Sequence, residues 1–480
     1  MSHGLHVLTD DQIRDLLENL TVDELESFRT ELRGTLHEYS TGTNVAQAGL
    51  LNQPERIVVD SEPTGTKTLF MPSTSPGGHA VKVITLSSST AHSPSDPRPR
   101  TSPTGAITLF TADGSPVGIL HASTLTAFRT ALASACLLIR RNKVHTITVF
   151  GSGQQAYWHI RLALMLRGST IRTVNIINRR FSEGCKLALK RFYGIPSDIK
   201  EREGWKDNVT FHVLTPGYGE YPRLLHQSVV AADVIFCCTP SMEPLFDGEW
   251  LTSHEGRRKG RLIVAIGSYT PAMRELPVEI LHQAVKRHGE GHFHYHKHAV
   301  EGGVVVVDTL DGALKEAGEV IEAGLQPKQL VELGELVMLQ KIAMAEDEVS
   351  DTSSTLSTLS TPGSDRLEKP DTGSSGSAMS TVFGSSKGSP PSSRPSSRDR
   401  TPSPSGQRKG PKLPLPHFHR RSSSRGDVGK KEKEDHLARW LQGGNVIYKS
   451  VGLGLMDLAV GIKLIHFAKE KGIGTHVDGF

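Results

Sequence analysis

The sequence predicts an α/β protein in which a doubly wound parallel sheet is joined to a second α/β part formed by both chain ends. Short apolar runs alternate with helix-forming stretches between residues 146 and 308, and other strand-like segments precede them. Folded composition also returns near the C-terminus. The hydrophobic fraction, 36% of 480 residues, is low for a wholly globular chain, so we expect part of it not to pack.

These patterns divide the chain into five stretches. Residues 1–130 are expected to begin the second α/β part, and residues 131–325 to form the parallel sheet with its helices. Residues 326–350 should return to the second part, residues 351–435 should be disordered, and residues 436–480 should complete the second part.

Two helices and several strands are predicted before residue 130. Thr9 and Thr21 are each followed by acidic residues and apolar residues at helical spacing, which is typical of helix N-caps. The strand-like segments after them are "ERIVVD", "TKTLFMPS", "AVKVITL" and "GAITLFTADGSPVGILHA". In the last of these, "ADGS" has the composition of a hairpin turn.

The alternation that predicts the parallel sheet runs from about Thr146 to Asp308. Helices are expected over "QQAYWHIRLALMLRG" and from Ser182 onward. The strands are expected at "TITVF", "TVNIIN", "FHVLTP", "DVIFCCT", "LIVAIG" and "GVVVVDT".

The stretch from Asp351 to Asp435 is dominated by Ser, Thr, Pro, Gly and charged residues. Without an apolar period it cannot bury enough surface to offset the entropy of ordering, so we predict a disordered insert. Its Ser-rich strings at 400–405 and 420–425 resemble kinase-accessible sites, which such composition also produces by chance. After the insert, an amphipathic helix is expected with Leu455, Leu458, Ala459, Ile462 and Ile465 on one face.

Composition excludes several classes of protein. The net charge of +4 comes without a basic face interleaved with aromatic residues, which argues against nucleic acid as a partner. No apolar run is long enough to span a membrane, and the N-terminal residues do not resemble a signal peptide. Cys136, Cys185, Cys237 and Cys238 form no disulfide-like framework, which is typical of reduced thiols. We therefore expect a cytoplasmic protein.

A glycine-rich turn, "GSGQQA", follows a predicted strand and opens a predicted helix. This context is typical of a Rossmann-type dinucleotide site, in which the helix N-terminus faces the pyrophosphate. Gly151 would make the tight turn, Gly153 would let the backbone approach phosphate, and the small Ala156 would let the helix pack on the strand. The predicted cofactor-binding residues here are Gly151, Ser152, Gly153, Gln154, Gln155 and Ala156.

The end of the next strand bears on the choice of cofactor. An NAD site has an acidic residue there for the ribose hydroxyls, whereas this chain has Asn178, Arg179 and Arg180. Because guanidinium groups pair with phosphate, these residues favour NADPH over NADH, which stays possible. Thr239 and Gly267 follow later strands of the same predicted sheet, so Thr239 is also expected beside the cofactor.

Several segments together resemble the ornithine cyclodeaminase/mu-crystallin family. They occur in the family's order and cover most of the chain apart from the insert. The matching segments are "QPERIV", "VKVITL", "LTAFRTALASA", "VFGSGQQAYWH", "ADVIFCCTPSMEPLFDGEWL", "AIGSYTPAMREL", "VVVVDTLDGALKEAGEV" and "YKSVGLGLMDLAVG".

The resemblance implies an NAD(P)-dependent enzyme with a Rossmann domain and a substrate and dimerisation domain built from both chain ends, usually a homodimer. By resemblance, Arg56 and Arg129 hold the carboxylate of a small imino or amino acid, and Lys82 contacts the substrate as the candidate catalytic residue. Bidentate arginine pairs suit that carboxylate, and a partly desolvated lysine could move a proton or only supply charge. Ser450 and Val451 match the family's loop that approaches nicotinamide and substrate. The resemblance implies that Ser450 contacts the cofactor and that Val451 contacts the substrate.

One position departs from the ornithine cyclodeaminases of the family. They carry an aspartate in the loop where this chain has Tyr269, so the deaminating cyclisation loses its obvious base. We therefore favour a ketimine reductase-like oxidoreductase acting at a C=N or C–N bond. The alternatives are ornithine cyclodeaminase itself, which forms proline and ammonia, and a non-enzymatic, NADPH-dependent ligand-binding protein.

The stretch "GHFHYHKHA" places His292, His294, His296 and His298 at alternating positions. In an extended strand they would share one face, but no cysteine or carboxylate partner is arranged beside them. We expect no metal site.

Overall fold

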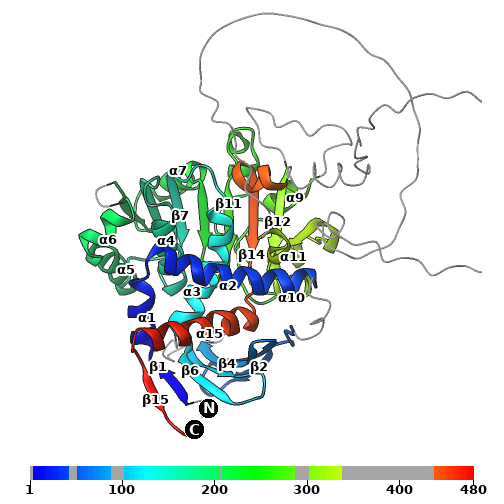
Figure 1. Cartoon of the computed structure of the whole chain (residues 1–480). Coiled ribbons are helices and arrows are strands. Elements are labelled where there is room, and N and C mark those ends of the chain that lie inside the picture. Colours follow the sequence, from blue (N-terminus) through cyan, green and yellow to red (C-terminus); the bar gives the residue numbers. More distant parts are fainter. Residues whose placement is uncertain (1–3, 43–50, 88–101, 206–207, 287–301, 338–436) are drawn as a thin grey trace, which may run out of the picture.

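The computed structural model describes residues 4–42, 51–87, 102–205, 208–286, 302–337 and 437–480. The predicted disordered insert, residues 351–435, lies outside the described residues, as does the histidine-rich stretch 291–299. Within the described part the chain forms two sheets, with helices between and around them (Figure 1).

The larger sheet has eight strands, all parallel, in the order β13-β12-β14-β11-β10-β7-β8-β9. The strand order reverses at β7, which pairs with β8 on one side and β10 on the other. Ligands of such sheets bind at that reversal, outside the carboxyl ends of the strands. The strands are β7 (Thr146–Phe150), β8 (Thr173–Ile177), β9 (Thr210–Leu214), β10 (Val234–Cys237), β11 (Leu262–Ala265), β12 (Gly303–Val307), β13 (Leu330–Glu332) and β14 (Asn445–Lys449).

Both faces of this sheet are covered, as continuous apolar strands predict. Successive residues of β10 and β11 belong alternately to two separate buried clusters, one on each face. The doubly wound prediction is therefore confirmed. The α-helices that accompany the sheet are α4 (Gln154–Arg167), α5 (Glu183–Gly194), α6 (Ser197–Arg202), α7 (Tyr221–Ala231), α8 (Glu249–Thr252), α9 (Val278–Val285), α10 (Leu310–Glu316), α11 (Gly318–Glu322) and α12 (Leu333–Leu336). Two 3₁₀ turns, η3 (Gly256–Arg258) and η4 (Pro327–Gln329), complete it.

The smaller sheet has seven strands in the order β15-β1-β6-β5-β4-β3-β2 and contains both ends of the chain (Figure 1). The β1–β6 pair is parallel and the other pairs are antiparallel. This confirms a second α/β part formed by both chain ends. Its strands are β1 (Leu5–Leu8), β2 (Ile57–Ser61), β3 (Thr66–Ser75), β4 (Gly78–Ser87), β5 (Thr104–Phe110), β6 (Pro116–His121) and β15 (Thr475–Val477).

The helices of this part begin as the sequence indicates. Thr9 caps α1 (Asp10–Glu18) and Thr21 caps α2 (Val22–Thr41), each through a capping box with the residue three positions later. The hairpin predicted at "ADGS" joins β5 and β6, with Gly114 at a φ of 89°. Two further helices, α3 (Ala122–Leu138) and α15 (Gly454–Glu470), pack beside α2.

Two strands correct the division of the chain. The sequence predicts that residues 326–350 and 436–480 belong to the second part, but β13 and β14 both belong to the eight-stranded sheet. β14 lies between β11 and β12, so the segment after the insert supplies an interior strand of the parallel sheet. A short apolar run predicts a strand but not the sheet that it joins, because that depends on distant pairing partners.

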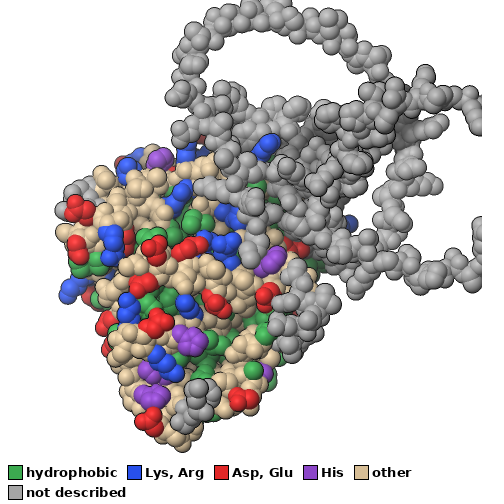
Figure 2. All heavy atoms as spheres, in the orientation of Figure 1, with side chains coloured by type: hydrophobic (Ala, Val, Ile, Leu, Met, Phe, Trp, Pro, Cys, Tyr) green, Lys and Arg blue, Asp and Glu red, His purple; other side chains and the backbone are tan. Residues whose placement is uncertain are grey.

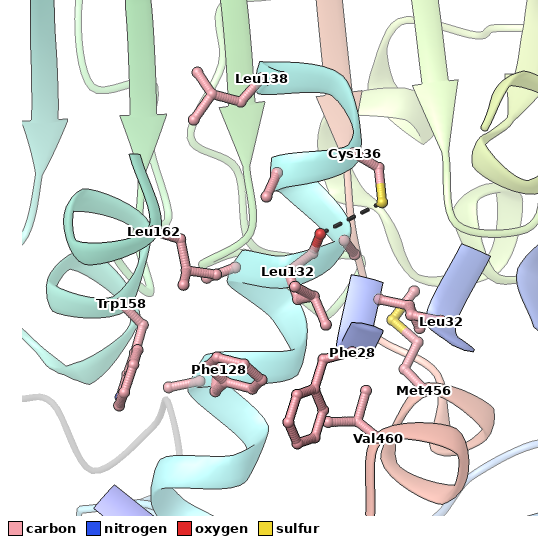
Figure 3. Close-up of a cluster of buried hydrophobic side chains, with 14 of the residues drawn as sticks. Phe28, Leu32, Phe128, Leu132, Cys136, Leu138, Trp158, Leu162, Met456 and Val460 are labelled. Carbon is pink, nitrogen blue, oxygen red and sulfur yellow. Dashed lines mark hydrogen bonds between the residues drawn. The ribbon is translucent and has the colours of Figure 1, made fainter. Parts of the chain in front are cut away.

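An aromatic core joins the helices that lie between the two sheets (Figure 3). Phe128 of α3 packs edge-on against Phe28 of α2, with ring centroids 5.8 Å apart, and against Trp158 of α4, at 5.3 Å. Met456 and Val460 bring α15 into the same cluster. Because this packing is dense, it fixes α3 and α15 relative to each other and to the parallel sheet.

The first half of α15 is more buried than an amphipathic helix requires. The predicted apolar face is present, since Leu455, Leu458 and Ile465 are buried. Every residue from 454 to 461 is nevertheless buried, including Asp457 with an exposed fraction of 0%. A helix that is buried all round lies inside a protein, and an acidic residue there needs partners.

Lys/Arg and Asp/Glu side chains are interspersed over the face that Figure 2 shows. Among the described helices we find none with the length and hydropathy to cross a lipid bilayer. All four cysteines are free, and Cys136 donates to the carbonyl oxygen of Leu132 within α3 (Figure 3). In the described part of the chain, no group of three or more His, Cys, Asp or Glu side chains is arranged to hold a metal ion.

Candidate active site

A cavity of about 710 Å³ is lined by residues from both sheets. The parallel sheet contributes the glycine-rich turn and the ends of β10, β11 and β14, and the other part contributes β3, β4 and α3. The charged side chains among the lining residues are all cationic: Arg56, Lys82, Arg129, Arg179 and Arg191. No aspartate or glutamate is among the lining residues that the structure describes. The cationic lining favours an anionic ligand.

The glycine-rich turn connects β7 to α4 at the point where the strand order reverses. Gly151 has a φ of 106°, and a Cβ there would lie 2.9 Å from the carbonyl oxygen of Cys238, so the turn requires glycine. Gly153 is the N-cap of α4 and makes no side-chain cap; a Cβ there would meet no atom within 4 Å. The amide groups at the start of α4 are thus available to a phosphate, and the turn fits a dinucleotide.

The predicted site residues fall into two groups. Those that line the cavity are Ser152, Gly153, Gln154, Gln155, Arg179, Ser450, Val451, Arg56, Lys82 and Arg129. Those that do not are Gly151, Ala156, Asn178, Arg180 and Thr239, whose contacts lie within the surrounding framework. Ala156 is buried against the sheet. Thr239 directs its amide and hydroxyl groups to Glu275, at 2.8 and 3.1 Å, while its neighbours Cys238 and Pro240 line the cavity.

The three residues after β8 have different surroundings. The Asn178 amide donates to the Ser152 hydroxyl and to the carbonyl oxygen of Arg180, both at 3.0 Å, and so ties this loop to the glycine-rich turn. Both arginines are exposed, but Arg179 is among the residues that line the cavity and Arg180 is not. Of the two arginines, Arg179 is the one placed at the cavity.

Arg191 of α5 is a lining residue that the sequence analysis missed. Its guanidinium lies 3.4 Å from the centroid of the Tyr157 ring and donates to Gln154 at 3.1 Å. It also forms an ion pair with Glu18 of α1. Arg191 thus holds the start of α4 against the second part of the molecule, and nothing in its local sequence indicates this.

Lys82 and Arg129 meet at a shared carboxylate. Lys82 of β4 donates to Asp457 Oδ2 at 2.5 Å, and Arg129 of α3 donates through Nε to Asp457 Oδ1 at 3.0 Å. All three side chains are almost completely buried. Burial is the largest influence on Lys82 and lowers the pKa of its amine to about 7, although Asp457 opposes the change.

Arg56 is engaged with the loop after β14. Its Nη2 group donates to the carbonyl oxygens of Val451 and Gly452, both at 3.0 Å, and pairs with Glu316 at 2.7 Å. Asp308, at the end of β12, holds the other side of this loop: its Oδ2 accepts from Ser450 Oγ at 2.7 Å and from the amides of Val451 and Gly452 at 3.0 and 2.8 Å. The loop is therefore fixed where it lines the cavity.

Tyr269 lines the cavity and lies in a turn that is held in place by buried charged side chains. Glu275 accepts from the amides of Gly267 and Ser268 at 2.7 and 3.2 Å, and burial raises the pKa of Glu275 to about 7. Lys449 donates to Ser268 and pairs with Glu319 at 3.2 Å. Burial also raises the pKa of the Tyr269 phenol. The turn thus presents a neutral phenol to the cavity.

Two acidic residues that organise the site were not recognised from the sequence as functional. Asp457 stands alone in the apolar run "GLGLMDLAVG", and Asp308 ends the apolar strand "GVVVVD". A single charge in a buried segment signals a partner in the fold. The sequence offers that signal but not the identity of the partner.

The model of the Ornithine cyclodeaminase/mu-crystallin family matches residues 17–196, which include β4, α3 and the glycine-rich turn. Over these residues the chain is similar to the ornithine cyclodeaminase/mu-crystallin family. The resemblance inferred from the ordered motifs is thereby confirmed.

Comparison with individual proteins shows similarity beyond residues 17–196. An uncharacterized protein of Saccharomyces cerevisiae is 26% identical over 363 residues, which are 70% of this chain and 88% of the yeast protein. The ketimine reductase mu-crystallin of Mus musculus is 26% identical over 237 residues, 49% of this chain. That match covers 59% of the mouse protein, so this chain spans little more than half the length of that relative.

The architecture is shared with solved structures of the family. The structure of Thermococcus litoralis Δ1-pyrroline-2-carboxylate reductase in complex with NADH and L-proline superposes with a TM-score of 0.55 and 15% sequence identity. The superposition covers 98% of this chain and 100% of that one. This likeness shows the fold.

Proposed function

We propose that the protein is an NAD(P)-dependent oxidoreductase that transfers hydride at the C=N or C–N bond of a small imino or amino acid. The observation that carries the proposal is a cavity with a phosphate-binding turn at one end, cations along its lining and no described carboxylate exposed in it. Relatives named as ketimine reductase and Δ1-pyrroline-2-carboxylate reductase support the same chemistry.

Each end of the cavity has a distinct task in this proposal. The amide groups at the start of α4 and the residues from Ser152 to Gln155 bind the cofactor pyrophosphate. A bound nicotinamide cofactor supplies the hydride. Arg129, with Arg56 beside it, holds the substrate carboxylate, and Val451 packs against the substrate.

Lys82 is the candidate for the proton that the substrate nitrogen takes when the C=N bond is reduced. Its amine lies in the cavity wall, and a pKa of about 7 lets it hold or release a proton near neutral pH. The reverse oxidation would return that proton to the same amine.

For the cofactor we propose a preference for NADPH. The loop after β8 carries no acidic residue for the ribose hydroxyls, and Arg179 there lines the cavity. A guanidinium can pair with a 2′-phosphate in two parallel hydrogen bonds. NADH would lack that contact but could still bind through the pyrophosphate.

We propose a homodimer formed through the outer face of the seven-stranded sheet. Ile57, Val59 and Val81 point away from the cavity side of this sheet and are 61%, 50% and 37% exposed. Exposed apolar side chains gathered on one sheet face are typical of a protein interface. The family resemblance also implies dimerisation through this part of the molecule.

The proposal is tested by following NADPH oxidation by absorbance with cyclic ketimine carboxylates and with pyruvate plus amines. We expect turnover by the wild type, and its loss in Arg129→Ala, with Arg223→Ala, an exposed arginine on α7, as the matched control. Cofactor bound without turnover by any of these substrates would contradict the enzyme and favour a ligand-binding protein. Proline and ammonia formed from ornithine would instead favour a cyclodeaminase, for which Tyr269 leaves no carboxylate base at that position.

A further inference from the structure

Asp457 lies behind the cavity wall and contacts two of the cations that line it. It lies on α15, after the insert, with an exposed fraction of 0%, and it is not itself among the residues that line the cavity. Its two oxygens face two different cations, Lys82 at 2.5 Å and Arg129 at 3.0 Å. A buried carboxylate is costly unless such partners satisfy it, so the three side chains form one unit.

The way that Asp457 binds these cations decides which donors they keep. Arg129 uses Nε for Asp457, and its Nη1 group makes a weak contact with the Met456 sulfur at 3.5 Å, so Nη2 is the donor group with the fewest contacts. A Cβ on Gly452 would lie 3.1 Å from both Nη atoms, so these groups lie under the loop that lines the cavity. Lys82 gives one donor to Asp457 and keeps the others.

The charges around Lys82 come from three separate elements. Asp457 approaches from α15, Arg129 from α3, and Arg56 from the segment before β2. The neighbours of Lys82 on the adjacent strands, Met71 and Ile107, are apolar and buried. Asp457 is thus the carboxylate that faces this amine, and without it three cations would stand together in a buried place.

We propose that Asp457 is the positioning residue of the site: it holds Lys82 and Arg129 side by side so that their remaining donors face the substrate. This inference rests on the proposed function for the identity of the substrate, but not for the coupling between the three side chains. Asp457 acts through its two partners and does not touch the substrate itself.

The coupling is tested without a substrate by a double-mutant cycle. The melting temperatures of wild type, Asp457→Asn, Lys82→Met and the double variant are measured from pH 6 to pH 10 (roughly the range over which the Lys82 amine titrates). We expect the difference between Asp457→Asn and wild type to change with pH, because the amide no longer favours a charged lysine. The same substitution in the Lys82→Met background should give a difference that is independent of pH.

The kinetic test uses the full-length enzyme with whichever ketimine carboxylate it turns over. Asp457→Asn should raise KM by about tenfold or more, since Arg129 loses its fixed orientation, and should move the loss of kcat/KM at high pH to lower pH. Asp478→Asn, which changes an exposed aspartate near the C-terminus, is the matched control.

The two tests separate this inference from the proposed function. If the wild type has no turnover, the proposed function fails while the thermal cycle still decides the coupling. If Asp457→Asn lowers the melting temperature equally at every pH and leaves KM unchanged, Asp457 is only structural and the inference is overturned. Should Asp457→Asn not fold, folding of the double variant, which removes the unpaired amine, supports the coupling, and failure of the double variant to fold while Lys82→Met folds overturns it.

Discussion

The Arg56 guanidinium donates a 3.0 Å hydrogen bond to the carbonyl oxygen of Val451, although 395 positions separate the two residues in the chain. This contact joins the segment before the first long hairpin to the loop after β14. Both residues line the same cavity. The cavity wall is therefore completed only when the chain returns from the insert and pairs β14 with β11 and β12.

Asp308→Asn should loosen this loop. Asp308 accepts hydrogen bonds from Ser450, Val451 and Gly452 on one oxygen and from the Tyr448 hydroxyl on the other, and asparagine, with a single acceptor oxygen and no charge, cannot accept at both places. We expect a loss of about 1–3 kcal/mol in the free energy of unfolding and a higher KM for the cofactor. Urea denaturation and NADPH titration measure the two effects. Asp311→Asn, three residues further on and exposed, should change neither.

Gly151→Ala should abolish cofactor binding. The new Cβ would lie 2.9 Å from the carbonyl oxygen of Cys238, at a φ of 106° that alanine rarely adopts. Gly114→Ala is the matched control, because its φ of 89° imposes similar strain while a Cβ there meets no atom within 4 Å. Fluorescence titration with NADPH should show binding to Gly114→Ala alone. Equal affinity in both variants would contradict the assignment of the turn.

Arg179→Ala should reduce the preference for NADPH over NADH. The lost pairing with a 2′-phosphate corresponds to about 1.5–3 kcal/mol, or roughly a 10- to 150-fold weaker Kd for NADPH, with little change for NADH. Arg180→Ala should have a smaller effect because Arg180 lies outside the cavity. Isothermal titration with both cofactors gives the ratio. An unchanged ratio in Arg179→Ala would refute the proposed preference.

Lys82 should make stability depend on pH above neutrality. Its pKa is about 7 in the folded protein against 10.5 for the free side chain, so the unfolded chain binds more protons between these values. The contribution of Lys82 to the free energy of unfolding therefore rises as pH increases from about 7 to about 10. Lys82→Met should remove this rise, measured by thermal denaturation across that range. Lys67→Met, at a lysine paired with Asp60 on the same sheet, should retain it.

Ile57→Asp should convert the proposed dimer to a monomer. A charge at this exposed position would be buried in the interface without a partner. Light scattering coupled to size-exclusion chromatography should show half the wild-type mass. Val22→Asp, at an exposed apolar position on α2, is the control and should leave the mass unchanged. A wild-type protein that elutes as a monomer would contradict the proposal directly.

Much of the fold follows from local patterns in the sequence. Strand and helix alternation, the capping residues Thr9 and Thr21, and the glycine-rich turn each depend on residues a few positions apart. The ordered family motifs also identified Arg56, Lys82 and Arg129, which the structure brings to one cavity. The caps, the alternation and the turn are recognised from neighbouring residues, whereas these three cations are recognised only through the resemblance to a family.

Other features depend on contacts between distant segments. The sequence shows that "NVIYK" is apolar, but it does not show that this segment becomes an interior strand of the parallel sheet. It gives Arg179 and Arg180 as neighbours, but it does not show which of them lines the cavity. The sequence by itself determined the elements and the phosphate-binding turn, because local hydrogen bonding and backbone sterics specify them. Only the tertiary structure decided that Asp457 pairs with Lys82, 375 positions away, because desolvation in the assembled core selects the partners of a buried charge.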